Sequence, residues 1–230
     1  MTIRQSRRNL KPKVLGYLQS DDLDEALNEL CRLPARQVIN PLFSFLLSTD
    51  EQTKWRAVTA MGAVVANLAE QDMESARVIM RRLMWSLNDE SGGIGWGAPE
   101  AMGEIIASHE GLAKEYISVL ISYIWKEGNF LEYEPLQRGA VWGVGRVAQV
   151  RPELIQDAGP HLLPYLESTD AAVRGLAAWA VGLLGVKEAY QRLEWLLRDG
   201  TEISMFPDRK LVRLYVSDLA KEALARIDKG

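Results

Sequence analysis

The sequence predicts an all-α fold: a right-handed α-solenoid (an α-α superhelix) of about five helix pairs, preceded by an N-terminal helical cap. The main observation is a motif of small and apolar residues that recurs five times along the 230 residues. Its copies are anchored at positions 62, 103, 145, 182 and 225, so the steps are 41, 42, 37 and 43 residues. A period in this range is typical of stacked helix pairs. No stretch shows sustained alternation of apolar and polar residues, so we expect essentially no β-sheet.

Small residues occupy the same columns of every copy. Two residues before the anchor there is an alanine or a glycine, and five residues before it there is always an alanine. Residues three or four apart share one face of a helix, and small side chains there let a neighbouring helix approach closely. The motif is therefore the second helix of each pair, called the B helix below. Its alanine column consists of Ala57, Ala98, Ala140, Ala177 and Ala220.

Residues 1–34 are predicted to form a basic arm and the helical cap. Short helices are expected over 13–20 and 23–33, and they would cover the first exposed face of a single continuous solenoid domain over residues 35–230. Candidates for the N-cap of the second helix are Asp21, Asp22 and Asp24. The arm contains no acidic residue and is expected to be solvated, with contact to phosphate or an acidic partner as the alternative. Its basic residues are Arg4, Arg7, Arg8, Lys11 and Lys13.

Another helical run, called the A helix below, precedes each B helix. The A helices are expected over residues 35–47, 73–87, 112–125, 152–166 and 187–197. Aspartates stand in the turns between the two helices of a pair, where a short side-chain acceptor caps the next helix. These aspartates are Asp50, Asp89, Asp170 and Asp199.

Composition restricts the class of protein. The chain is 47% hydrophobic, which is enough to bury a sizeable core, and its formal net charge of −4 provides no global basic field for nucleic acid or lipid. No run approaches the roughly 18 apolar residues of a membrane span. Cys31 is the only cysteine, so disulfides within the chain are excluded, and the first residues do not resemble a signal peptide. We therefore predict a cytoplasmic protein.

One side of the B helices carries aromatic and charged residues. Positions seven and three before the anchor and one after it are related as i, i+4 and i+8, so they form one stripe along the helix. B helices are expected to line the concave wall of the solenoid, and Trp and Arg are enriched at binding hot spots. The alternative is that the tryptophans pack against adjacent repeats and the charges pair with each other. The predicted partner-binding stripe comprises Trp55, Trp96, Glu100, Glu104, Arg138, Trp142, Arg146 and Trp179.

Two unusual loops are expected at one end of this stripe. Residues 91–97 contain four glycines in six residues, which suggests positive φ or a close approach of the backbone. This glycine-rich loop is interpreted as a partner or small-ligand loop, a phosphate site or a purely structural loop. Residues 129–135 mix aromatic and acidic residues. If equivalent turns stack, the two loops form a cleft lined by Trp96, Glu132, Tyr133, Arg138 and Trp142.

The repeat resembles the HEAT repeat in the short form shared with phycobilin lyases. That form has the pattern Val-Arg-x-x-Ala-Ala-x-Ala-Leu-Gly-x-Leu-Gly, and residues 173–185 match it nearly position for position. The other copies match its small-residue columns, so the resemblance covers roughly residues 35–230. It implies HEAT-like helix pairs in a scaffold or partner-binding protein. Phycobilin lyases and bacterial alkylpurine DNA glycosylases are relatives for which the resemblance implies other activities.

No catalytic constellation is recognisable. The two histidines, His109 and His161, lie in no metal-binding spacing, and no nucleophile elbow or triad appears. We therefore predict a non-catalytic HEAT-like adaptor that binds a protein or peptide on its concave face. No cofactor, metal, nucleic acid or membrane is expected, and the oligomeric state is left open. The alternative is an enzyme or ligand-binding protein, DNA glycosylase-like or bilin lyase-like, that uses the cleft beside the glycine-rich loop.

Overall fold

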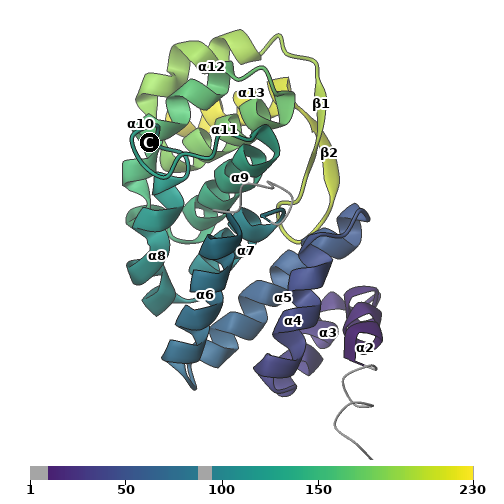
Figure 1. Ribbon diagram of the computed structural model, residues 1–230. Coiled ribbons are helices and arrows are strands. Elements are labelled where there is room, and N and C mark those ends of the chain that lie inside the picture. Colours follow the sequence, from purple (N-terminus) through teal and green to yellow (C-terminus); the bar gives the residue numbers. More distant parts are fainter. Residues whose placement is uncertain (1–9, 88–94, 230) are drawn as a thin grey trace, which may run out of the picture. The chain divides into compact units, whose positions relative to one another are not determined.

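A computed structural model describes residues 10–87 and 95–229 (Figure 1). The chain divides into two compact units, Met1–His109 and Glu110–Gly230, and each is described by itself. Both consist of stacked helices, so the predicted fold class is confirmed as a mostly helical repeat solenoid. Within the described residues, every helix is too short or too polar to cross a bilayer. The predicted domain limits, 1–34 and 35–230, stay a prediction.

The described residues of the N-terminal unit form two short helices, predicted above as a cap, followed by two helix pairs. Asp22 and Asp50 are the N-caps of the second and fourth helices, and their carboxylates accept from the backbone N–H groups of Glu25 and Thr53 at 2.9 and 2.8 Å. These predicted caps are confirmed, because short acceptors satisfy the free N–H groups of a helix start. The helices are α2 (Leu10–Leu18), α3 (Leu23–Arg32), α4 (Ala35–Leu46), α5 (Glu51–Ala69), α6 (Met73–Leu87) and α7 (Ala98–Ser108).

Helix α5 lies at the centre of this unit and packs against α3, α4, α6 and α7. Its small-residue columns are fully buried, with Ala57 and Ala60 at 0% exposure. A Cβ added to Gly62 would lie 2.5 Å from Cγ of Glu104 on α7, so the glycine allows the two B helices to approach. The predicted role of the small residues is confirmed here.

The C-terminal unit contains three helix pairs, but its middle A helix is broken. The prediction of one helix over 152–166 is wrong, because prolines at 152, 160 and 164 each start a new short helical segment instead of continuing the last one. The elements are α8 (Glu110–Ser122), α9 (Glu134–Val150), η1 (Pro152–Leu154), η2 (Gln156–Ala158), α10 (Gly159–Leu162), η3 (Leu163–Glu167), α11 (Ala171–Leu184), η4 (Lys187–Ala189), α12 (Tyr190–Leu196) and α13 (Val216–Ile227).

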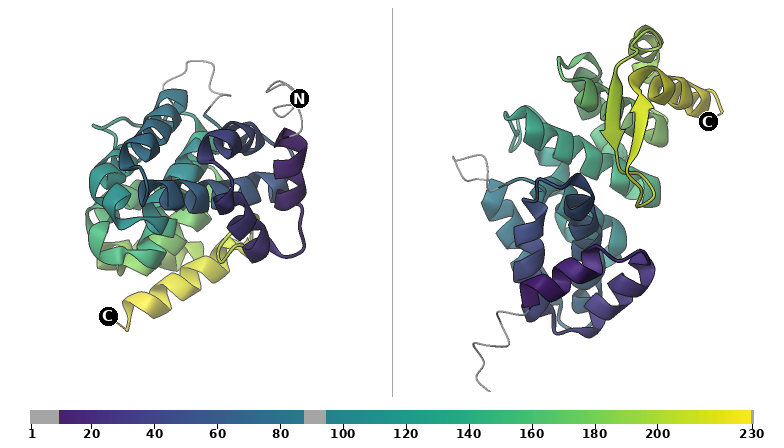
Figure 2. Two further views of the ribbon diagram at one scale, coloured as in Figure 1. Left: turned by 90° about the horizontal axis from the view of Figure 1, so that it is seen from below. Right: turned by 90° about the vertical axis from the view of Figure 1, so that its right-hand side faces the viewer.

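A β-hairpin lies between α12 and α13, and the expectation of essentially no sheet is wrong at this point. Strands β1 (Glu202–Met205) and β2 (Val212–Tyr215) pair antiparallel and lie side by side next to α13 (Figure 2). Ile203 and Met205 are buried, while Glu202 and Ser204 of the same strand are exposed. This alternation covers only four residues, which is too short to stand out in the sequence.

The aspartate predicted to cap the last B helix has another role. Asp199 precedes the hairpin, and no side chain caps the start of α13 at Val216, so the predicted carboxylate cap is wrong. The carboxylate of Asp199 instead accepts from the backbone N–H of Thr201 at 3.1 Å and pairs with Arg174. The hairpin returns the chain to this point, because the backbone carbonyl of Asp199 accepts from the N–H of Ser217 in the first turn of α13 at 3.0 Å.

The B helices α9, α11 and α13 pack against one another in order. A Cβ on Gly145 of α9 would collide with the indole of Trp179 on α11. A Cβ on Gly182 of α11 would lie 2.6 Å from the Cα of Ala223 on α13. The small residues of this unit thus receive the neighbouring B helix, as predicted.

Candidate partner-binding surfaces

The acidic residues of the predicted stripe in the N-terminal unit are interior groups. Glu100 and Glu104 are 3% and 4% exposed. Lys54, in the first turn of α5, donates to Glu100 Oε1 at 2.7 Å, and its ammonium lies 5.3 Å from the ring centroid of the half-buried Trp55. This carboxylate therefore joins two adjacent B helices, and little of it is available to a partner.

Trp96 is the accessible aromatic residue of this part of the stripe, with 44% of its surface exposed. It is followed by Gly97, the N-cap of α7, whose φ of 76° favours glycine. A Cβ at Gly97 would also lie 2.9 Å from the carbonyl oxygen of Leu46, so glycine is needed for close approach as well. Residues 91–94 of the glycine-rich loop lie outside the described residues, and ligand binding by this loop stays a prediction.

An ion pair also joins two adjacent B helices in the C-terminal unit. Arg138 on α9 donates from Nε to Asp170 Oδ2 at 3.0 Å, and Asp170 caps α11 by accepting from the N–H of Val173 at 3.0 Å. Burial raises the pKa of Asp170, but these hydrogen bonds outweigh it and hold the pKa below its usual value. Arg138 is therefore engaged within the fold.

Arg174 repeats this arrangement one helix later. It donates to Asp199 from Nε at 2.9 Å and from Nη2 at 2.6 Å. Burial raises the pKa of Asp199, and hydrogen bonds from Thr201 and Arg174 reverse the shift, so that the pKa is lowered. The pairs Lys54–Glu100, Arg138–Asp170 and Arg174–Asp199 together form what we call the charge ladder.

Two tryptophans of the predicted stripe are buried and do not form a surface. Trp142 is 2% exposed, and its indole N–H donates to the carbonyl of Phe206 in the hairpin loop at 3.3 Å. Trp179 is 8% exposed and packs against Gly145 of the neighbouring helix. Both therefore have the structural role that was the alternative interpretation of the stripe.

The remaining predicted site residues are more accessible. Glu132 and Tyr133 are exposed, and Arg146 is half-buried and donates to Gln149 at 3.0 Å. The predicted cleft combines Trp96 of the N-terminal unit with residues of the C-terminal unit, and it stays a prediction.

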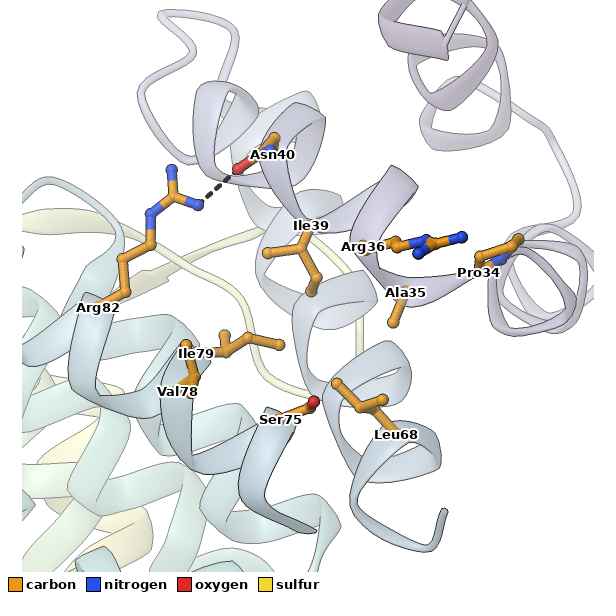
Figure 3. A pocket seen from close by; sticks show the side chains of 10 residues that line it. All are labelled: Pro34, Ala35, Arg36, Ile39, Asn40, Leu68, Ser75, Val78, Ile79 and Arg82. Carbon is orange, nitrogen blue, oxygen red and sulfur yellow. Dashed lines mark hydrogen bonds between the residues drawn. The ribbon is translucent and has the colours of Figure 1, made fainter. Parts of the chain in front are cut away.

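A groove that the sequence did not suggest lies between two A helices of the N-terminal unit (Figure 3). We call it the α4–α6 groove; its volume is about 530 Å³, within the range of roughly 300–1,000 Å³ of small-ligand pockets. Apolar side chains form most of its lining, and Figure 3 shows Arg82 and Arg36 at opposite ends. The groove is lined by Pro34, Ala35, Arg36, Ile39, Asn40, Leu68, Ser75, Val78, Ile79 and Arg82.

Arg82 is held in place by neutral groups. It donates from Nη1 to Asn40 Oδ1 at 2.6 Å, and its guanidinium lies 3.9 Å from the ring centroid of Phe43. Neither Arg82 nor the exposed Arg36 forms an ion pair with any described residue. In contrast, Arg81 on the same helix pairs with Glu74 at 2.6 Å. The groove thus has two positive charges that no carboxylate in the described part of the chain compensates.

Exposed tryptophans lie at or just after the ends of A helices. Trp85 on α6 and Trp195 on α12 are each 82% exposed. Trp125, which follows α8, is 41% exposed, and its ring centroid lies 5.2 Å from that of His161 with the two rings tilted. Trp195 lines a second groove of about 680 Å³ in the C-terminal unit, together with Arg192 and Arg198. The sequence contained one sign of the accessible face of α6. The spacing of Val78, Arg82 and Trp85 places an apolar, a basic and an aromatic residue on one helix face.

Three comparisons with known proteins bear on these surfaces. A family model for the HEAT-like repeat matches residues 134–184. An uncharacterized protein of Archaeoglobus fulgidus is 31% identical over 193 residues, which covers 79% of this chain and 92% of that protein.

Solved structures share the fold. A designed armadillo repeat protein in complex with the peptide (KR)4 has a TM-score of 0.54 and 21% identity, covering 94% of this chain and 98% of its own. The crystal structure of an engineered protein also has a TM-score of 0.54, at 19% identity and with coverage of 96% and 99%. At these identities the likeness concerns the fold alone.

Proposed function

This chain belongs to the same family as the Archaeoglobus fulgidus protein and contains HEAT-like repeats, and on this premise we propose that it is a non-catalytic scaffold that binds a protein or peptide partner. Repeat solenoids present extended surfaces to partners. The designed armadillo repeat protein with the same fold holds a peptide. The proposal places the protein in the cytoplasm, in accordance with its single cysteine and its composition.

The α4–α6 groove is the observation that carries this proposal. It joins an apolar lining to two positive charges without intramolecular ion pairs among the described residues. Val78 on its rim is 53% exposed and Trp85, further along the same helix, is 82% exposed. Exposed apolar surface of this kind is unfavourable in water unless a partner covers it, and tryptophan is enriched among the residues that dominate binding energy.

The accessible part of the B-helix stripe is a second candidate surface for the same function. Trp96 is 44% exposed beside the start of α7, and Trp55 is half-buried beside Lys54. These two residues are accessible members of the stripe for which the sequence predicted a concave face. The enzyme and bilin-lyase alternatives rest on the family resemblance, and no contact in the described residues favours either of them.

Site-directed photo-crosslinking tests the proposal and separates the two surfaces. The photoreactive residue p-benzoylphenylalanine is placed at Val78 in the groove, at Trp96 in the stripe, or at the exposed Lys221 of α13 as a control. Each protein is irradiated in lysate of the source cells, and crosslinked proteins are identified by mass spectrometry. All three positions are exposed, so folding is expected to be unaffected, which circular dichroism checks.

The outcomes differ clearly. A partner captured from position 78 and absent from the control supports the groove, and capture from position 96 alone moves the same function to the stripe. Failure of positions 78 and 96 to capture any protein beyond the control would overturn the scaffold proposal.

A further inference from the structure

We infer that the α4–α6 groove receives an amphipathic helix that carries carboxylates; this inference rests on the scaffold function proposed above. The groove runs between two neighbouring helices, the arrangement into which a third helix inserts its apolar ridge. The face of α6 from Ser75 to Trp85 spans about 15 Å at 1.5 Å per residue. A partner helix of about three turns covers that length.

The lining accommodates the apolar face of such a helix. The buried Ile39 and Ile79 form part of the lining, and the more accessible Leu68 and Val78 lie beside them (Figure 3). Ile39 and Ile79 are each 6% exposed, so they are fixed by packing, while Val78 and Trp85 remain free to be covered. Burying apolar surface contributes roughly 25 cal/mol per Å², so this part of the contact supplies affinity without selecting a charge.

The charge of the groove selects the partner. Acidic residues make up 31 of the 230 residues, yet none is among the ten that line the groove, which contains two arginines instead. The chain as a whole has a net charge of −4, so this local positive surface is not a consequence of composition. A partner with carboxylates beside its apolar stripe is complementary to it.

Arg82 is prepared for carboxylate recognition. Its contacts with Asn40 and Phe43 position the guanidinium and use the Nη1 donor, without cancelling its charge. A planar guanidinium matches a carboxylate in a bidentate geometry, and a side chain that is already positioned loses less freedom on binding. Arg36 provides a second, exposed positive charge at the opposite end of the groove (Figure 3).

Fluorescence anisotropy with designed peptides tests this inference. One labelled peptide is a three-turn helix with leucines along one face and glutamates beside them; a second has lysines in place of the glutamates. The peptide (KR)4 is the basic probe without an apolar face. We expect the acidic helix to bind at least about tenfold more tightly than the lysine helix, the effect of one charge-assisted hydrogen bond. The preference should weaken as ionic strength rises.

Matched variants assign the preference to the groove. Arg82→Gln and Arg36→Gln should each weaken binding of the acidic helix. Arg81→Gln makes the same change on the same helix at a residue that pairs with Glu74 and does not line the groove, so it should leave binding unchanged. Val78→Asp should weaken both amphipathic peptides, and circular dichroism verifies that each variant is folded.

Several results would overturn the inference about the acidic helix. They would not decide the scaffold function, which the crosslinking experiment tests separately. These results are equal binding of acidic and lysine helices, binding of neither, or equal losses in Arg82→Gln and Arg81→Gln. Self-association of the free protein that Val78→Asp abolishes would identify a second copy of the chain as the occupant instead. Tighter binding of (KR)4 than of the acidic helix would reverse the charge assignment.

Discussion

Two tryptophans of the B helices, Trp142 and Trp179, and two at the ends of the A helices, Trp85 and Trp195, have opposite environments. Trp142 and Trp179 are 2% and 8% exposed, whereas Trp85 and Trp195 are each 82% exposed. The difference follows from what each indole faces: Trp179 packs on Gly145 of the next B helix, where a Cβ would collide with it. A large residue opposite a small one on a neighbouring helix is thus a packing pair, and recognition surfaces are better sought where no such counterpart exists.

The largest effect is expected when a buried indole is removed. Trp142→Ala should lower the free energy of unfolding by roughly 3–5 kcal/mol, because it leaves a cavity and removes the hydrogen bond to Phe206. Urea denaturation followed by circular dichroism measures this. A loss below about 1 kcal/mol would mean that the indole is not part of the core.

Filling the space opposite Trp179 should have the next largest effect. Gly145→Ala places a Cβ in collision with ring carbons of the Trp179 indole, and overpacking of this kind destabilises by roughly 1–3 kcal/mol. Gly16→Ala is the matched control: Gly16 is an exposed residue of α2 with no atom within 4 Å of an added Cβ. That change should stabilise by roughly 0.5–1 kcal/mol, as usual for glycine within a helix. Equal effects at both sites in thermal unfolding would contradict the packing-pair interpretation.

The charge ladder should weaken in acid. The pKa of Asp170 is lowered in the folded chain, so its carboxylate stabilises the fold above the unfolded pKa, and this contribution is lost as pH falls through the folded pKa. The free energy of unfolding should therefore decline below about pH 4. Asp170→Asn keeps a helix-capping acceptor but loses the charge, and should reduce stability by about 1 kcal/mol at neutral pH.

The same variant provides the check on this ladder. Urea midpoints measured from neutral to acidic pH should fall less steeply for Asp170→Asn than for the wild type. Parallel pH profiles for the two proteins would show that the ion pair with Arg138 contributes nothing to stability.

The smallest effects on stability are expected at the exposed tryptophans. Trp85→Ala and Trp195→Ala remove side chains that are 82% exposed, so the free energy of unfolding should change by less than about 0.5 kcal/mol. Differential scanning calorimetry of both variants gives the measurement. A loss as large as that of Trp142→Ala would remove the contrast between the two groups of indoles.

Local features of the fold could be predicted from the sequence, and distant ones could not. Asp22, Asp50 and Asp170 cap helices as expected, since a cap needs only residues that are close in sequence. The hairpin was missed because each strand has four residues. The burial of Trp142 was missed because its cover, Phe206, lies 64 positions later in the chain.

The candidate sites show the same limit. The stripe residues were assigned to three columns of the repeat, but their availability depends on partners such as Lys54 for Glu100 and Asp170 for Arg138. The α4–α6 groove depends on how two A helices lie side by side, and the spacing of Val78, Arg82 and Trp85 marks only the α6 face of it. The periodicity of apolar residues in the sequence predicts which face of one helix is buried. A groove depends on the distance between two helices, which periodicity does not give.

The hairpin also imposes a temporal order on folding during synthesis. The Phe206 carbonyl that accepts from the indole N–H of Trp142 is added 64 residues after that indole. At about 5–20 residues per second, that interval lasts roughly 3 to 13 s. Throughout it, the α9 surface around this indole lacks the cover of the hairpin loop, so nascent chains halted before the hairpin should bind a holdase that the finished protein does not.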